Sequence, residues 1–306
     1  LFLFDVAMFK RFFSFAYKIQ VSRFAEITFL QFDKLLISRY LSLGTVSYYQ
    51  VGSAIVSRFR DCALQVVAAI FPAVSELHAK MDQERLVTLY ERGSKYICII
   101  GVSMVFFTMI EASLIIRAWL GHGFEQAMWI LRVLAPVYCL NLLTGIAISM
   151  AAGLGKNIYQ MNAAIIHAAL NIVLSLLLIS RFGLNGLLVS ITVSMTVSVV
   201  YFMVVFHRFI KVPLLPFVTR FCMKPFIVAL FVSLILFFIE QPIGVFPGRL
   251  INISLLVIKA AFFFSLFFLV LFRIRYLDAY DQHIFLRALG LRLKGSGSLR
   301  KTHGTE

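Results

Sequence analysis

Eight apolar runs of about 20 residues, the length that crosses a bilayer as a helix, divide this chain and most constrain its fold. Short segments that are charged or rich in proline and glycine separate the runs. The runs cover 15–38, 46–72, 95–117, 127–150, 162–180, 186–206, 224–240 and 250–272. The pattern predicts an all-α, polytopic membrane helix bundle with about 8 transmembrane helices.

The composition excludes most other classes of protein. Hydrophobic residues make up 61% of the chain, and only 14% are charged, against about 25% in a typical soluble domain. A soluble enzyme could not cover this much apolar surface, and a disordered chain would not contain it. The four cysteines lie in apolar runs without a pairing or metal-binding spacing, so we interpret them as small buried side chains.

The distribution of basic residues predicts the orientation in the membrane. Sixteen Lys and Arg side chains lie in one set of connections and in the C-terminal tail, whereas the opposite set holds Arg39, Arg117, Arg181 and Arg249. Cytoplasmic loops carry the excess of Lys and Arg. We therefore expect a multi-pass protein of the cytoplasmic (inner) membrane with both ends of this sequence in the cytoplasm. The net charge of +15 then requires no nucleic-acid partner.

Ionisable side chains inside the first run need an explanation, because each costs about 2.5–3.5 kcal/mol to insert. Arg23, Glu26, Asp33 and Lys34 share one face at the helical period. In the second run Arg58 and Asp61 stand three positions apart and can pair.

Two interpretations of these charged faces stay open. They are ion pairs that hold the bundle together, or they line a water-filled cavity for a charged substrate, which we favour because six charges exceed what packing needs. Arg60 points the opposite way on its helix, and we assign it nothing beyond a local ion pair or a snorkelling side chain.

Weaker candidates lie in other runs. Glu111 is either a coupling-ion carboxylate or an interfacial residue. Lys259 has no acidic neighbour in sequence, and either snorkels or meets an anionic headgroup. Stripes of small and polar residues around Asn141 and around His167 are typical of helix packing. No catalytic, cofactor or metal motif occurs, so we expect a transporter rather than an enzyme.

Seven short stretches, taken in order, resemble the second half of the polysaccharide biosynthesis family, the flippases of lipid-linked O-antigen repeat units. This family belongs to the superfamily of multidrug, oligosaccharidyl-lipid and polysaccharide exporters. The stretches are 32–38, 43–49, 71–77, 89–96, 118–124, 131–135 and 181–186, and the resemblance runs from about residue 5 to 206.

The resemblance implies a two-lobe, V-shaped exporter that works by alternating access. Residues 15–206 would then be its second six-helix lobe, and 207–272 two additional transmembrane helices. Residues 1–14 would be a cytoplasmic lead-in and 273–306 a basic cytoplasmic tail. The first lobe would lie upstream of this sequence.

The resemblance also implies a substrate and roles for the charged residues. The expected substrate is an undecaprenyl-pyrophosphate-linked oligosaccharide repeat unit, flipped for surface polysaccharides such as O-antigen, with membrane lipids and H⁺ or Na⁺ as partners. Arg23, Lys34 and Arg58 would contact the pyrophosphate or glycan. Glu26, Asp33 and Asp61 would hold these cations or carry the coupling ion. The alternatives are a cation-coupled multidrug antiporter and a flippase of another lipid-linked precursor.

Overall fold

The structure is a computed structural model that describes residues 6–68, 70–240, 248–278 and 281. Within these residues every regular element is an α-helix, as predicted. The helices are α1 (Val6–Tyr40), α2 (Leu43–Ala68), α3 (Ile70–Ala79), α4 (Gln83–Leu120), α5 (Glu125–Leu143), α6 (Gly145–Gly153), α7 (Asn157–Ile210), α8 (Leu214–Phe221), α9 (Met223–Glu240) and α10 (Arg249–Arg273).

The helices follow the eight predicted runs, but their divisions differ. Helices α2 and α3 share one run, and α5 and α6 share another, while α7 contains two runs in 54 residues. Six helical segments of the described chain are long and apolar enough to cross a membrane, and α7 is one of them. Helix α1 is outside these six, because charges dilute its apolar character.

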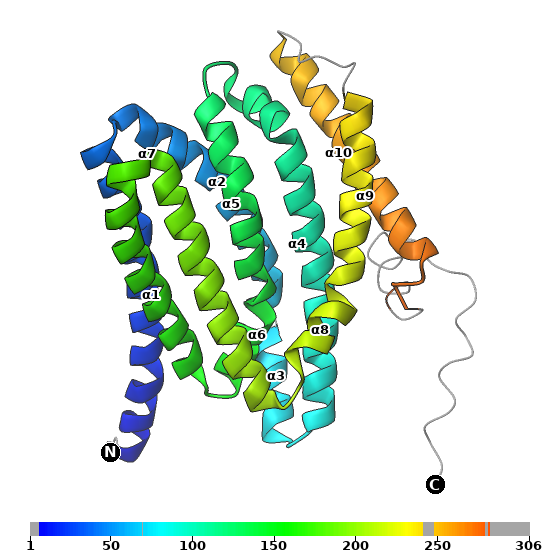
Figure 1. Cartoon of the computed structure of the whole chain (residues 1–306). Helices are drawn as coiled ribbons and strands as arrows, with labels where there is room; N and C mark the ends of the chain where they lie inside the picture. The colour runs from blue at the N-terminus through cyan, green and yellow to red at the C-terminus, as the bar shows by residue number, and fades with distance from the viewer. Residues whose placement is uncertain (1–5, 69, 241–247, 279–280, 282–306) are drawn as a thin grey trace, which may run out of the picture.

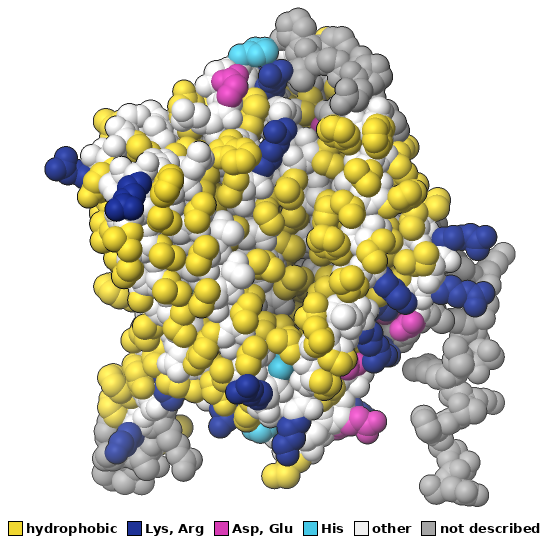
Figure 2. Space-filling view, in the orientation of Figure 1, with side chains coloured by type: hydrophobic (Ala, Val, Ile, Leu, Met, Phe, Trp, Pro, Cys, Tyr) yellow, Lys and Arg dark blue, Asp and Glu magenta, His cyan; other side chains and the backbone are white. Residues whose placement is uncertain are grey.

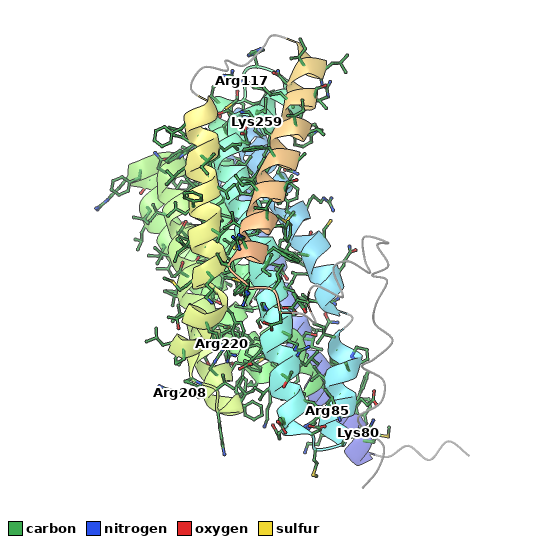
Figure 3. All side chains as sticks on the ribbon, turned by 90° about the vertical axis from the view of Figure 1, so that its right-hand side faces the viewer. Lys80, Arg85, Arg117, Arg208, Arg220 and Lys259 are labelled. Atoms are coloured by element: carbon green, nitrogen blue, oxygen red, sulfur yellow. The ribbon has the colours of Figure 1, made fainter. Side chains whose placement is uncertain are left out.

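Helix α4 extends twelve residues before the predicted start of its run at residue 95. The helix can begin in this polar segment because Asp82 caps it: the Asp82 side chain accepts a hydrogen bond from the Arg85 N–H at 3.1 Å. Helices α3 and α4 meet at this turn. Lys80, Arg85, Arg208 and Arg220 all lie toward this end of the bundle, which we call the basic end (Figure 3).

A hairpin divides α7 into two antiparallel arms, 157–182 and 184–210 (Figure 1). Gly183 makes the bend with φ 56° and ψ −135°, a conformation almost restricted to glycine. Just beyond it the arms approach closely, since a Cβ on Gly186 would lie 2.4 Å from the carbonyl oxygen of Leu178. Two glycines therefore allow two predicted spans to follow each other without a loop.

Gly183→Ala is expected to lower the free energy of unfolding by about 1–3 kcal/mol, because alanine must adopt the strained backbone of the bend. Gly44→Ala is the matched control, since a Cβ on this helical glycine meets only Ser42 Oγ at 3.7 Å. The melting temperatures of the two purified variants in detergent are compared, and that of Gly183→Ala should be the lower. An equal melting temperature for both would contradict the role of Gly183.

Helix α4 stands at the centre of the arrangement (Figure 1). On one side α5 packs against α4, α2 packs against α5, and α1 lies along α7. On the other side α9 and α10 pack against α4. Large apolar side chains such as Val173 and Val189 are more than half exposed, and Figure 2 shows apolar surface over most of the visible face. An exposed apolar surface of this extent fits a lipid environment.

The segment after α10 is attached to α4 at a buried cluster of polar groups. Lys95 Nζ lies 2.5 Å from Asp281 Oδ2, and both side chains are more than nine-tenths buried. Tyr96 and the backbone N–H of Asp278 also donate to this carboxylate. The predicted tail 273–306 therefore begins as a docked segment, while residues 282–306 lie outside the described residues.

This attachment is expected to depend on pH only under acid conditions. Burial raises the pKa of Asp281, but the hydrogen bonds from Lys95, Tyr96 and the Asp278 N–H outweigh it, so the pKa lies below its usual range. A carboxyl with a lowered pKa stabilises the docked state above its ordinary pKa of about 3.9, and this contribution is lost as the pH falls through the lowered value. Protease cleavage after residue 273 should be unchanged from pH 8 to 5 and faster below about pH 4. In the Asp281→Asn variant cleavage should be fast at every pH. A rise in the cleavage rate of the wild type near pH 6 would contradict this assignment.

Candidate functional site

A cavity of about 610 Å³, which we call the polar cavity after the charged and polar groups in its otherwise apolar lining, lies among α1, α2, α3, α5, α6 and the two arms of α7. Apolar side chains such as Val67 and Phe202 form part of its wall. The polar and charged lining residues are Ser22, Arg23, Glu26, Arg60, Asn141, Thr144, Ser149, Asn157, Gln160, His167 and Ser198. Hydroxyl, amide and guanidinium groups thus face one space inside an otherwise apolar bundle.

Arg60 connects the walls of this cavity. Its Nε and Nη2 donate to Asp61 Oδ1 at 3.2 and 3.0 Å, and Nη2 lies 3.6 Å from Glu26 Oε1 on α1. On the α5 side, Nη1 lies 3.5 Å from Asn141 Oδ1, and the guanidinium stands 5.3 Å from the Tyr138 ring centre. Two carboxylates and an aromatic ring therefore hold the guanidinium in place.

The guanidinium remains able to bind an anion. Arginine has five N–H donors in a plane, and the Nη1 contact with Asn141 is the longest of its hydrogen bonds. The Arg60 side chain is 15% exposed, so it is largely withdrawn from water while it faces the cavity. An anion that enters the cavity would compete with Asn141 for Nη1, and Arg23 on α1 supplies a second positive charge.

The structure brings together only part of the predicted charged set. Arg23 and Glu26 line the cavity, and Asp61 borders it through its pairing with Arg60. Lys34 and Arg58 are not among the residues that line it. Asp33 and Lys34 lie about 10 Å or more along α1 from Glu26, so a shared helical face does not bring all four side chains into one cavity. Arg58 is an exposed residue of α2.

Asp33 occupies a separate, closed site between α1, α2 and the first arm of α7. Its side chain is completely buried, and the Tyr49 hydroxyl donates to Oδ2 at 3.2 Å. The amide of Asn171, also completely buried, lies beside the carboxyl group. Among the described residues Oδ1 has no hydrogen-bond partner. A carboxylate with a phenol and an amide beside it can hold a proton or a hard cation.

Glu111 and Lys259 form an ion pair, which corrects the interpretation of Lys259 made from the sequence. Lys259 Nζ lies 3.1 Å from Glu111 Oε1, and the two side chains are 10% and 0% exposed. Lys259, buried against Glu111, therefore neither snorkels nor meets a headgroup, whereas both interpretations of Glu111 stay predictions. The acid and the base are 148 positions apart, so only the packing of α10 against α4 reveals them as partners.

Sequence reasoning missed several residues of the cavity. Arg60 had no assigned role beyond a local ion pair or a snorkelling side chain, and the stripes containing Asn141 and His167 were interpreted as helix packing. The structure places Arg60, Asn141 and His167 in the cavity lining. The available signal was the repetition of polar stripes on two separate runs, which indicates a common polar interior rather than two independent contacts.

Comparisons with known proteins agree with this architecture. A family model described as "Polysaccharide biosynthesis protein" matches residues 2–129. The resemblance to polysaccharide biosynthesis proteins is confirmed. A probable low-salt glycan biosynthesis flippase, Agl15, of Haloferax volcanii is 22% identical over 175 residues, which cover 55% of this chain and 36% of that protein.

Solved transporters share the fold. A MOP superfamily transporter of Pyrococcus furiosus aligns with 76% of this chain and 55% of its own, with a TM-score of 0.60 and 17% identity. The lipid II flippase MurJ in an inward closed conformation aligns with 89% of this chain and 53% of its own, with a TM-score of 0.58 and 17% identity. An outward-facing multidrug resistance MATE transporter of the same superfamily aligns with 92% of this chain and 68% of its own, with a TM-score of 0.59 and 15% identity. The chain thus spans about a third of the curated relative and about half of two of these transporters.

Proposed function

We propose that the protein containing this chain flips undecaprenyl-pyrophosphate-linked oligosaccharide repeat units across the cytoplasmic membrane by alternating access. The observation that carries the proposal is the cavity that joins Arg23, Arg60 and several amide and hydroxyl groups inside an apolar bundle. A pyrophosphate needs cationic donors, a glycan needs hydroxyl and amide partners, and a polyprenyl chain needs the surrounding bilayer. The resemblance to polysaccharide biosynthesis proteins supports the same class of substrate.

The cavity residues take distinct roles in this proposal. Arg60 binds the pyrophosphate oxygens, since a guanidinium can donate to phosphate at two positions. Arg23 adds positive charge from α1, while Glu26 and Asp61 orient Arg60 when no substrate is bound. Lys34 and Arg58, which lie outside the lining, would reach the substrate only in another state of the cycle.

We assign ion coupling to Asp33 rather than to the cavity carboxylates. Asp33 is buried without a basic partner among its described contacts, whereas Glu26 and Asp61 are engaged with Arg60. Taking up H⁺ or Na⁺ neutralises a buried carboxylate and so changes the packing of α1 against α7. The binding of one ion at this site would bias the equilibrium between the two conformations of the exporter.

Asp33→Asn is expected to reduce glycan export at least tenfold and to remove its dependence on the ion gradient. The amide is nearly the same size but cannot exchange a proton or neutralise a cation. Export measured in membrane vesicles, with the H⁺ and Na⁺ gradients imposed separately, gives the result. Tyr49→Phe removes only the hydrogen bond and should retain gradient dependence. Gradient-dependent export by Asp33→Asn would exclude Asp33 as the coupling residue.

The proposal also assigns the domain organisation and orientation. Residues 15–206 form the second six-helix lobe, and 207–272 contribute the two additional helices, which pack on α4 through α9 and α10. The basic end faces the cytoplasm, in agreement with the positive-inside rule. The cavity is then one wall of the transport path, and a first lobe supplies the other wall.

Complementation tests the function directly. The open reading frame that contains this chain is expressed in a strain that lacks its own flippase for lipid-linked repeat units, and surface glycan is measured. Restored glycan is the expected result. A full-length, membrane-inserted protein that restores no glycan with any of several repeat-unit structures, and instead lowers drug accumulation, would indicate a multidrug antiporter.

A further inference from the structure

A rigid elbow joins the second arm of α7 to α8 at the basic end. Helix α7 ends at Ile210 and is capped by Lys211, which has a left-handed backbone with φ 58°. His207 fixes the turn, because its Nδ1 lies 3.0 Å from the carbonyl oxygen of Val212 and its Nε2 lies 2.8 Å from the Tyr90 hydroxyl. The carbonyl requires Nδ1 to donate, and Tyr90 can then donate to Nε2, so a neutral imidazole satisfies both contacts.

A shallow groove of about 420 Å³ follows this elbow. Arg208 and Lys211 are its cationic lining residues, and Val204, Val212 and Leu214 provide apolar walls. A further cation lies nearby, since Lys156 Nζ is 5.2 Å from the ring centre of Phe209. The groove thus combines exposed positive charge with apolar surface, and both are held by a fixed turn.

Among the residues that the structure describes, neither Arg208 nor Lys211 forms an ion pair with an acidic group. No Asp or Glu occurs between residues 126 and 239. The other basic pair at the same end provides a contrast, because Lys80 Nζ lies 2.6 Å from Glu76 and Arg85 Nε lies 3.2 Å from Asp82. Figure 3 shows Arg208 and Lys80 at separate places on the basic end, Arg208 near the end of α7 and Lys80 in the turn after α3. Arg208 and Lys211 thus remain available to an external anion.

The elbow stands at the end of an apolar stretch of α7 that is as long as the hydrocarbon layer is thick, so its position fits the headgroup region of a bilayer. Exposed apolar side chains on the second arm of α7 run from Val189 to Phe209, which is about 30 Å of helix and equals the hydrocarbon thickness. Arg208 and Lys211 stand at the end of this apolar stretch. Helix α8 continues the pattern, since it buries Phe217 and Phe221 while Leu215 is 75% exposed. Its exposed apolar face and the cations of the elbow are thus available to the same lipid.

We propose that this elbow is a binding site for a phospholipid with an anionic headgroup. Arg208 and Lys211 contact the phosphate, and the exposed face of α8 contacts the acyl chains at the level of Leu215. The bound lipid would hold α8 against the membrane interface and fix the junction between the proposed six-helix lobe and the α9–α10 hairpin. The site contains no residue of the polar cavity, so it stands whether or not the proposed transport function is correct.

Native mass spectrometry of the purified chain in a neutral detergent tests the site. Dioleoyl phosphatidylglycerol and dioleoyl phosphatidylcholine are added in separate titrations, and the bound lipids are counted. We expect tighter binding of the anionic lipid. Each basic residue near a headgroup contributes about fivefold, so Arg208→Gln with Lys211→Gln should weaken phosphatidylglycerol binding about 30-fold.

Matched variants decide between this site and a general effect of charge. Lys80→Gln with Arg85→Gln removes the same charge from the same end, and should leave the affinity within about twofold because Glu76 and Asp82 already neutralise that pair. An equal loss in both double variants, or equal binding of the two lipids by the wild type, would overturn the proposal. Displacement of the lipid by an equal concentration of inorganic phosphate would also overturn it, because a free anion would then account for the site.

Discussion

Arg60→Gln is expected to reduce export of lipid-linked glycan by about 10- to 100-fold, while Arg58→Gln retains most of it. A hydrogen bond to a charged group contributes about 1.5–3 kcal/mol, which corresponds to this range. Arg60 lines the cavity and connects α1, α2 and α5, whereas Arg58, two positions earlier on α2, lies outside the lining. The two variants remove the same charge from the same helix, so any difference in export between them reports the position of the arginine relative to the cavity.

Surface glycan per molecule of membrane-inserted protein is the measurement for this pair. Arg60→Gln also leaves Glu26 and Asp61 without their cation, so a loss of inserted protein must be separated from a loss of transport. Arg60→Lys serves this purpose, because it keeps the charge but loses the planar array of donors. We expect normal abundance and intermediate export for the lysine variant. Full export by Arg60→Gln, or loss of export by Arg58→Gln alone, would transfer the substrate contact to the other face of α2.

Breaking the Glu111–Lys259 pair is expected to destabilise the packing of α10 on α4 by about 3–5 kcal/mol, because either single variant leaves a buried charge without its partner. Glu111→Gln removes the negative charge that faces Lys259. Lys259→Met removes the positive charge that faces Glu111, whose side chain is completely buried. Replacing both together, Glu111→Leu with Lys259→Met, removes both charges and should recover most of the lost stability.

Thermal unfolding in detergent, followed by loss of the monodisperse peak in size-exclusion chromatography, measures the three variants. Both single variants should lose the peak at a clearly lower temperature than the wild type and the double variant. This result would assign the pair to helix attachment. A double variant that is stable but inactive in export would instead give the pair a part in transport, and single variants as stable as the wild type would show that the pair contributes little.

The apolar runs were sufficient to predict the all-α membrane bundle and the approximate positions of its spans. A helix that crosses a bilayer satisfies its own backbone hydrogen bonds, so its existence depends on local composition and length. For the same reason the sequence indicated that charges in the first two runs needed an explanation. It also carried the order of motifs that resembles polysaccharide biosynthesis proteins.

The pairing of charged residues could not be read from helical periodicity. Periodicity gives the angle of a side chain around its own helix but not the neighbour that packs against that angle. Asp33 and Glu26 share a face of α1, yet one is completely buried beside Tyr49 and the other lines the cavity beside Arg60. Arg60 was left without a role in the cavity because its partners Glu26 and Asn141 belong to other helices.

Local composition by itself determined the helical nature and the approximate positions of the apolar spans, since the cost of placing polar backbone in hydrocarbon acts on every span separately. Only the tertiary structure decided which charges meet. Glu111 and Lys259 are 148 positions apart, and the attachment of Lys95 to Asp281 joins the N-terminal half of α4 to the segment after α10. Such pairs are selected by helix packing, because a buried charge is stable only where the fold brings its partner within a few ångströms.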